Sequence, residues 1–305
     1  MDFIPTHLGA AILALVPMTV VAAAVFLYRW HMRSRSGRNP LTKALLNQPG
    51  ASLRSKLIEE QDHFDALLLI SAVLGAYIAG FAAGHQVEQD IGVAFWATVG
   101  GGAIVVLLWL VHRAISSFKR IQRLRLGLDG EMATGEELSH LMRLGYHVFH
   151  DIPGANYNID HAVVGPNGVF AIETKTHAKP ASGYQAKFDG RVIHYPDRSD
   201  FQAVEQAERN AHTLGEFLFK AAGRRAHVRA IVILPGWCVN HTGKNQGCHV
   251  LASGQVDWIP KIKGATLSPE DITSIAHQLE RLCRREAPVV LSQLDVGKYE
   301  PKLAI

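Results

Sequence analysis

Two acidic residues and one lysine have the types and the spacing that hydrolytic chemistry needs. They are Asp160, Glu173 and Lys175, all within the run from Ile159 to Lys175. Side chains alternate between the two faces of a β-strand, so Glu173 and Lys175 share one face. The turn sequence Gly165-Pro166-Asn167-Gly168 predicts a hairpin that places Asp160 on the neighbouring strand. We therefore expect the three side chains to converge at one end of a sheet.

Such a group could hydrolyse a phosphodiester bond. Carboxylates are hard oxygen ligands that suit Mg²⁺ or Mn²⁺. A bound metal polarises the phosphate and lowers the pKa of a coordinated water, and a lysine beside it can orient that water and stabilise charge on the phosphate. The alternative is a surface ion pair between Glu173 and Lys175, worth under about 1 kcal/mol. The apolar run from Val169 to Ile172 favours a buried strand, where a charge is costly unless it is paired or metal-bound.

The elements around this group predict an α/β domain. A helix is expected from Glu131 to Leu144, ended by Gly145, and Gly127 and Gly130 are expected to separate it from the helical segment before it. Strands are expected at 146–152, 159–164, 168–175 and 227–234, with a hairpin at 187–195 and a weak strand near Val250. Further helices are expected at 201–222 and after Ser268, an N-cap residue. This order predicts an α/β sandwich with a mixed central sheet.

The first third of the chain predicts a membrane region. Three long apolar stretches, at about 10–28, 66–84 and 91–111, are each long enough to be a transmembrane helix. Residues 1–112 are therefore predicted to be the transmembrane region, which gives the protein a lipid bilayer as a partner. Residues 113–126 follow as a basic juxtamembrane linker.

The distribution of positive charge predicts the orientation in the membrane. Lys and Arg are frequent between the first two apolar stretches and after the third, and are missing from His85 to Asp90. The positive-inside rule then places the N-terminus outside and the C-terminal domain in the cytoplasm, in the cell (inner) membrane. The formal net charge of +4 comes from these flanks, since acidic and basic residues nearly balance after residue 126. The charge is therefore no evidence for a nucleic-acid-binding surface.

Small residues in the apolar stretches concern helix packing. Gly80 and Gly84 form a G-x-x-x-G pair, which lets helices approach closely. We expect this pair to serve packing within one chain, and the alternative is a homo-oligomer formed through the transmembrane helices.

The three cysteines have no framework spacing, which argues against a disulfide scaffold.

Three segments together resemble the nuclease-related domain, NERD, of the PD-(D/E)XK restriction-endonuclease-like superfamily. They are Gly127-Leu128-Asp129-Gly130-Glu131, the run Ile159 to Lys175, and Gln206 with Asn210 on the following helix. The resemblance implies a NERD core at 127–235 and a restriction-endonuclease-like fold, and it leaves 236–305 as a C-terminal extension that it does not cover.

The same resemblance implies roles for single residues. Asp160 and Glu173 would bind the metal, Mg²⁺ or Mn²⁺, and Lys175 would serve the nucleophilic water. Glu131 matches an acidic position that is often a further metal ligand, and Gln206 matches a glutamine that borders such sites. The chain departs from the family after the lysine, where Thr176-His177-Ala178 replaces the usual aromatic residue. His161 follows Asp160 directly, so it should point to the opposite face and be structural.

These observations predict a membrane-tethered, metal-dependent nuclease that hydrolyses DNA, or RNA as the second choice, on the cytoplasmic side. The alternative is a nucleic-acid-binding or signalling module that has the nuclease-like fold without catalysis. A membrane scaffold that binds proteins is a third reading, and it leaves the acidic residues unexplained. Residues 127–305 are expected to fold on their own.

Overall fold

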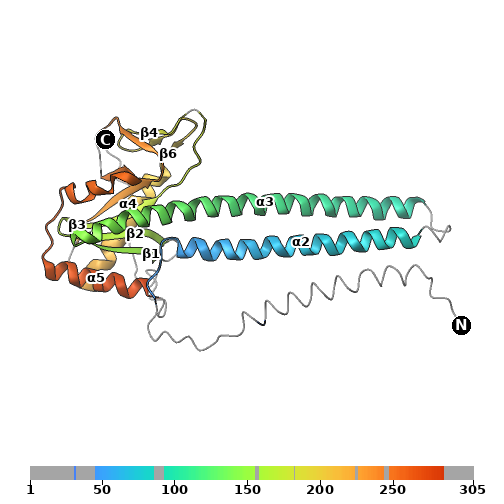
Figure 1. The fold of residues 1–305 in the computed structure, drawn as a ribbon, viewed down its shortest axis with the longest axis horizontal. Helices are drawn as coiled ribbons and strands as arrows, with labels where there is room; N and C mark the ends of the chain where they lie inside the picture. Colours follow the sequence, from blue (N-terminus) through green and yellow to red (C-terminus); the bar gives the residue numbers. More distant parts are fainter. Residues whose placement is uncertain are drawn as a thin grey trace. The chain divides into compact units, whose positions relative to one another are not determined.

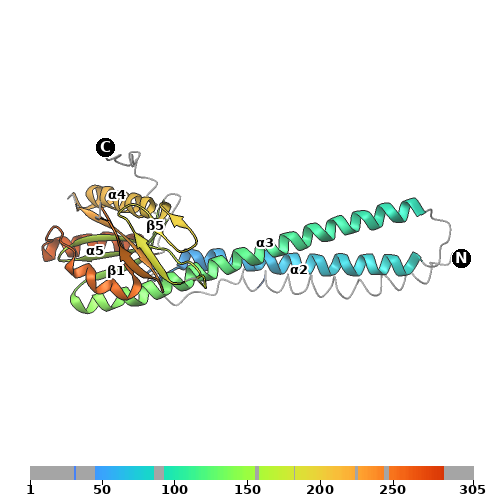
Figure 2. The ribbon, with the colours of Figure 1, turned by 90° about the horizontal axis from the view of Figure 1, so that it is seen from above.

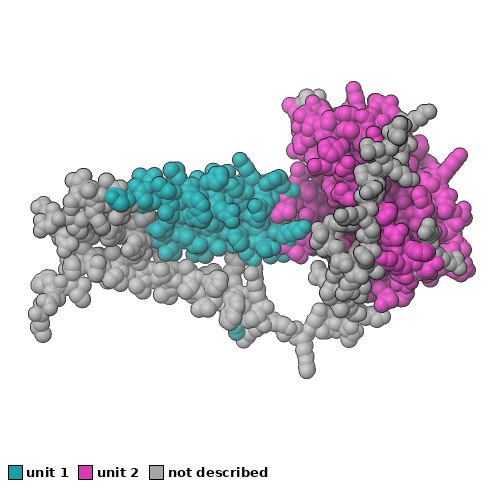
Figure 3. Space-filling view, turned by 180° about the vertical axis from the view of Figure 1, so that it is seen from behind, with its two compact units in different colours: residues 1–42, 56–123 teal, residues 43–55, 124–305 magenta. Residues whose placement is uncertain are grey.

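The structure is a computed structural model that describes residues 31, 45–85, 93–154, 158–181, 183–223, 226–243 and 247–284. The chain divides into two compact units (Figure 3). Unit 1 comprises Met1–Thr42 and Lys56–Arg123, and unit 2 comprises Lys43–Ser55 and Leu124–Ile305. The predicted transmembrane helix at 10–28 lies outside the described residues.

Two long helices make up the described part of unit 1 and continue into unit 2 (Figure 1). They are α2, Ala51–His85, and α3, Val93–Ser139. Within unit 1 they are joined by Glu60 of α2, whose carboxylate accepts hydrogen bonds from Ser117 Oγ at 2.7 Å and Arg120 Nη1 at 3.2 Å. The predicted stretches 66–84 and 91–111 both fall on these helices, except that residues 91 and 92 are not described.

One helix in the described part of the chain is long and apolar enough to cross a membrane. It runs from Gly100 to Leu144, and its most apolar window has a mean hydropathy of 1.6 with only 11% of the window buried. Val105 and Leu108 in this helix are 67% and 63% exposed. Contiguous exposed apolar residues of this kind mark a surface that contacts a protein or a membrane. The described residues therefore hold one such helix where three were predicted.

A five-stranded mixed sheet forms the centre of unit 2. Its strands are β1 (His147–Pro153), β2 (Asn158–Gly165), β3 (Gly168–Thr174), β7 (Val228–Leu234) and β9 (Cys248–Ala252), in this order across the sheet. Pairing is antiparallel from β1 to β3 and parallel from β3 to β9. The predicted mixed sheet and the hairpin around Asn167 are confirmed.

Helices cover both faces of this sheet (Figures 1 and 2). One face packs against α4 (Gln202–Ala222) and α5 (Pro269–Cys283), through residues such as Leu214 and Leu279. The other face packs against the end of α3, the 3₁₀ helices η1 (His140–Leu144) and η2 (Ser253–Lys261), through residues such as Leu138 and Ile259. Ser268 caps α5 as predicted, since its Oγ accepts the Asp271 N–H at 3.2 Å.

A second, smaller sheet lies outside the central one, with the strand order β6-β5-β4-β8. Its strands are β4 (Gln185–Phe188), β5 (Ile193–His194), β6 (Ser199–Asp200) and β8 (Cys238–His241). The predicted hairpin at Asp189 is confirmed, because Asp189 Oδ1 accepts the N–H groups of Arg191 and Val192. The parallel pairing of β4 with β8 was not predicted.

The predicted interruption of the helix at Gly127 and Gly130 is wrong. Helix α3 runs without a break to Ser139 and tightens into η1, which ends at Gly145 with a left-handed φ of 83°, as predicted. Gly130 serves close packing instead, because a Cβ at this position would lie 1.7 Å from Thr176 Oγ1. The sequence alone does not tell a glycine that ends a helix from a glycine that allows a strand end to pack closely against the helix.

Residues 46–52, here called the strap, belong to unit 2 although the sequence analysis placed them in the transmembrane region. Asn47 N donates to Cys283 O at 2.9 Å, and Asn47 Nδ2 donates to Asp151 O at 2.9 Å. Ser52 N, in the first turn of α2, donates to Asp151 Oδ2 at 2.8 Å. Asp151 is buried and has a left-handed φ of 47°. The strap thereby anchors the start of α2 in the same unit as the end of α3.

Candidate active site

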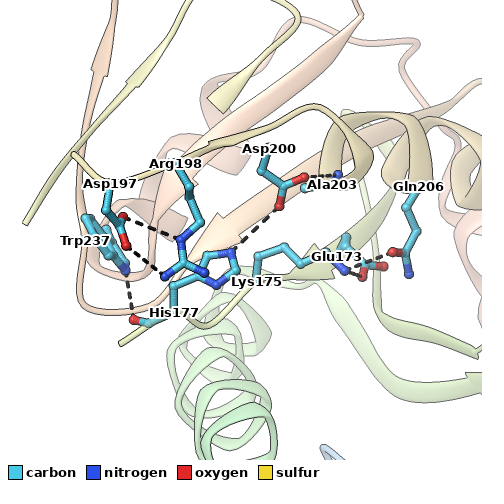
Figure 4. Close-up of polar contacts among 9 residues, drawn as sticks. All are labelled: Glu173, Lys175, His177, Asp197, Arg198, Asp200, Ala203, Gln206 and Trp237. Carbon is cyan, nitrogen blue, oxygen red and sulfur yellow. Dashed lines mark hydrogen bonds and ion pairs between the residues drawn. The ribbon is translucent and has the colours of Figure 1, made fainter. Parts of the chain in front are cut away.

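Lys175 and Glu173 form the centre of the candidate site, at the end of β3 (Figure 4). Lys175 Nζ lies 2.8 Å from Glu173 Oε1 and donates to Gln206 Oε1 of α4 at 2.9 Å. Glu173 is 2% exposed, whereas the Lys175 side chain is 25% exposed. The structure thus brings three of the predicted site residues together, and the predicted common face of Glu173 and Lys175 is confirmed.

Asp160 joins them from β2. It stands one residue beyond the paired residues His161 and Ile172, and its Oδ2 accepts the Thr174 N–H at 2.7 Å. Burial raises the pKa of Asp160 well above its usual value, and the neighbouring Glu173 and Glu131 raise it further. A pKa raised by two other carboxylates shows that these acids crowd one another.

Glu131 completes the acidic group from α3. It is 7% exposed, and burial, followed by Asp151 and Glu173, raises its pKa to about 7. The Gly50 N–H of the strap opposes this increase by hydrogen bonding to the carboxylate. Glu131 Oε2 has no hydrogen-bond partner among the described residues. A buried carboxylate oxygen without a partner is one that a cation could occupy.

Asn210 is a site residue whose contact the sequence did not predict. Its Nδ2 donates to Glu173 Oε2 at 2.9 Å, and its side chain is 1% exposed. Gln206 and Asn210 are four residues apart on α4, so their side chains lie on one face of the helix and contact the same end of β3. Burial raises the pKa of Glu173, while Lys175 and Asn210 lower it in part.

Lys175 remains a cation in this setting. Burial alone would lower its pKa, but Glu173, and then Asp160 and Asp200, raise it above the usual value. Lys175 is therefore a hydrogen-bond donor and a fixed positive charge. It cannot serve as a base while it carries its proton.

The donor set suits a hard divalent cation in its chemistry. Asp160, Glu173 and Glu131 supply only oxygen ligands, burial raises the pKa of all three, neighbouring carboxylates raise those of Asp160 and Glu131 further, and Glu131 Oε2 lacks a partner among the described residues. In their described positions, however, no group of three His, Cys, Asp or Glu residues is placed to hold a metal ion. Glu173 Oε1 is paired with Lys175 Nζ, and Asp160 Oδ2 accepts the Thr174 N–H, so both oxygens already have partners.

His161 lies on the other face of the sheet, as predicted. It is fully buried, and its Nδ1 lies 2.8 Å from Nδ1 of His150 on β1. Burial lowers the pKa of both rings, to about 4 for His150. One nitrogen of such a contact must donate and the other accept, so the two rings are neutral and structural.

A second polar pair adjoins Lys175 on the side away from Gln206. His177 Nε2 lies 3.8 Å from Asp200 Oδ2, and Asp200 Oδ1 accepts the Ala203 N–H at 3.0 Å (Figure 4). From the sequence, His177 stands out only as part of the departure from the family pattern. Its position at two-residue spacing from Glu173 and Lys175 was the signal that could have identified it.

Known proteins match part of the chain. The sequence profile of the nuclease-related domain, NERD, matches residues 126–235, less than half of the chain. Among solved structures, SfsA of Pyrococcus furiosus in complex with Ca²⁺ is similar at 17% identity and a TM-score of 0.24. That match covers 43% of this chain and 56% of the other, so the chain spans about half the length of that protein. No curated protein matches the chain. The residues that form the candidate site all lie within the matched range, 126–235.

Proposed function

We propose that unit 2 is a metal-dependent nuclease that hydrolyses phosphodiester bonds of DNA, with RNA as the second choice. The observation that carries this proposal is the contact between Lys175 Nζ and Glu173 Oε1 at 2.8 Å, inside a group of buried carboxylates. A structural ion pair has no need for two further acids, Asp160 and Glu131, whose pKa values are raised by burial and then by neighbouring carboxylates. A site for a cation and a phosphate needs all of them.

Each residue of the group has a task in this reaction. Asp160, Glu173 and Glu131 would hold Mg²⁺ or Mn²⁺, which polarises the phosphate and activates water when it is bound. Lys175 orients the water and stabilises the charge that grows on the phosphate oxygens. Gln206 fixes the Lys175 ammonium, and Asn210 fixes the Glu173 carboxylate, through the hydrogen bonds described above.

We further propose that α2 and α3 tether unit 2 to the cytoplasmic side of the cell (inner) membrane, together with the stretch 10–28. The exposed apolar residues of α3 and the basic residues that follow them support this placement. Packing through Gly80 and Gly84 would allow a homo-oligomer in the bilayer.

A binding or signalling module without catalysis is the second candidate. The ion pair between Lys175 and Glu173 favours this candidate, because Lys175 Nζ is paired with a Glu173 oxygen that a metal would need as a ligand. Cleavage separates the two. The purified full-length protein should cut DNA when Mg²⁺ or Mn²⁺ is added and should not cut it in EDTA. Binding of DNA without cleavage under any of these conditions would favour the module.

A further inference from the structure

His177 lies beside the proposed site, next to Lys175. The His177 side chain is 23% exposed and Asp200 is 19% exposed, close to the 25% of Lys175. These three polar side chains are therefore neither in the core nor free in solvent. Figure 4 shows Lys175 between Glu173 and His177, with Asp200 beside His177.

One buried aromatic residue holds the backbone of His177 and another packs against its ring. Trp237 Nε1 donates to the His177 carbonyl oxygen at 3.2 Å, and the Tyr195 ring packs edge-on at a centroid distance of 4.8 Å. Tyr195 and Trp237 are themselves buried. A histidine backed by two buried aromatic residues keeps one orientation, as a group that transfers a proton must.

Asp200 orients the ring and connects it to Lys175. Its Oδ1 is held by the Ala203 N–H at the start of α4, and its Oδ2 faces His177 Nε2 at 3.8 Å, an ion-pair contact longer than a hydrogen bond. His177, and more weakly Lys175, lower the pKa of Asp200, so this carboxylate is ionised. A carboxylate that faces one ring nitrogen leaves the other nitrogen, Nδ1, for a substrate.

We propose that His177, oriented by Asp200, is the general acid that protonates the leaving oxygen of the phosphodiester. This role rests on the proposed nuclease function. Lys175 cannot supply that proton readily because its neighbours hold it as a cation, and the three carboxylates would hold the metal. His177 is the titratable group that lies next to Lys175.

The step balances in atoms and charge. The oxygen of water forms the new bond to phosphorus, and one proton of that water passes to solvent. The bond between phosphorus and the leaving oxygen breaks, and this oxygen keeps the electron pair and takes the proton from Nδ1 of His177. The imidazole then regains a proton from solvent, and the products are a phosphate monoester and an alcohol.

The test uses the full-length protein with Mn²⁺ and three DNA strands: one all-oxygen, one with sulfur at the 3′-bridging position and one with sulfur at the 5′-bridging position of the cleaved link. Sulfur leaves without a proton. His177→Ala should therefore slow cleavage of the all-oxygen strand about 10²–10⁴-fold and change cleavage of one sulfur strand less than about threefold. The rescued strand identifies which bond breaks. Affinity for uncut DNA should not change.

The chain offers a matched control. His194 and Asp189 form a similar pair at 3.0 Å, but both are 44% exposed and outside the carboxylate group. His194→Ala should cleave all strands at the unaltered rate. Equal losses on all three strands for His177→Ala, or no loss, would overturn the role of His177 and leave the nuclease proposal intact. Failure of the unaltered protein to cut any strand would overturn the nuclease proposal.

Discussion

The ammonium group of Lys175 lies 2.8 Å from Oε1 of Glu173. The contact gives the two residues opposite effects on a cation, since a divalent metal is attracted by the carboxylate and repelled by the ammonium. Glu173→Gln should abolish cleavage, with a loss of about 10²-fold or more, and weaken Mn²⁺ binding strongly. Lys175→Ala should also abolish cleavage, yet leave Mn²⁺ binding unchanged or stronger.

Calorimetric titration with Mn²⁺ and a cleavage assay on both variants test this prediction. His161→Ala, on the other face of the sheet, is the control and should change neither metal binding nor cleavage. If Glu173→Gln binds Mn²⁺ like the unaltered protein, the carboxylates are not the metal ligands and unit 2 is a binding module.

Glu131 predicts how the stability of the metal-free protein depends on pH. Its pKa is about 7 in the folded state against an ordinary value of 4.5. A raised carboxyl pKa means that the folded state binds more protons than the unfolded state between these values. The free energy of unfolding should therefore fall as the pH rises from 4.5 to 7, by on the order of 1–3 kcal/mol.

Glu131→Gln should reduce this dependence by the part that Glu131 contributes, and the raised pKa values of Asp160 and Glu173 leave a smaller fall in place. The variant should be more stable than the unaltered protein at pH 8 and no more stable at pH 4, by urea unfolding in EDTA. Glu136→Gln, at an exposed position of the same helix, should leave the pH dependence unchanged. A steep fall in stability that persists in Glu131→Gln would assign it to Asp160 and Glu173.

Replacing Gly130 with alanine should change stability in the direction opposite to the usual one. Alanine in place of glycine inside a helix normally stabilises it by up to about 1 kcal/mol. At position 130 the new Cβ would overlap Thr176 Oγ1, so we expect a loss of about 1–3 kcal/mol and slower cleavage. Thr176 is the residue between Lys175 and His177, which explains the effect on cleavage.

Gly127→Ala is the matched control on the same helix, because its Cβ would meet only the end of the Leu53 side chain, at 3.2 Å. Thermal unfolding of both variants decides the matter. The double change Gly130→Ala with Thr176→Ala should recover stability. If Gly130→Ala alone is as stable as Gly127→Ala, the close approach of Thr176 is not present in the protein.

The strap predicts which fragment of the chain is stable. Residues 127–305 lack the Gly50, Ser52 and Asn47 groups that pair with Glu131 and Asp151. A chain of 43–305 in which a short Gly/Ser linker replaces 56–123 should unfold with a higher free energy than the fragment 124–305. The linker can be short because Leu53 lies beside Gly127. Equal stability of the two chains in urea would show that the strap contributes nothing.

The charge pattern predicts the topology. A reporter that is active only in the cytoplasm should be active when it is fused after Ile305 and silent when it is inserted between His85 and Asp90. The opposite result would place unit 2 outside the cell and exclude cytoplasmic DNA as its substrate.

Local patterns were enough to predict the elements that carry the site. Alternation placed Glu173 and Lys175 on one face, and the turn at Asn167 placed Asp160 beside them, because both depend on neighbours in the chain. The strap could not be predicted, since its contacts join Asn47 to a residue 104 positions away. Gly130 was misread because a glycine pattern does not tell a helix break from a close approach. His177 was not assigned because its partner Asp200 comes from a different sheet.

The strap also determines when unit 2 can be completed during synthesis. Residues 46–52 leave the ribosome long before Glu131 and Asp151, and most of helices α2 and α3 is made in between. A loop of this length is closed at an entropic penalty unless its middle is already ordered. Pairing of α2 with α3 through Glu60 and Ser117 provides that order. A chain whose helices fail to pair would therefore leave Glu131 and Asp151 without their backbone donors, so that the acidic group would be completed only after the two helices have paired.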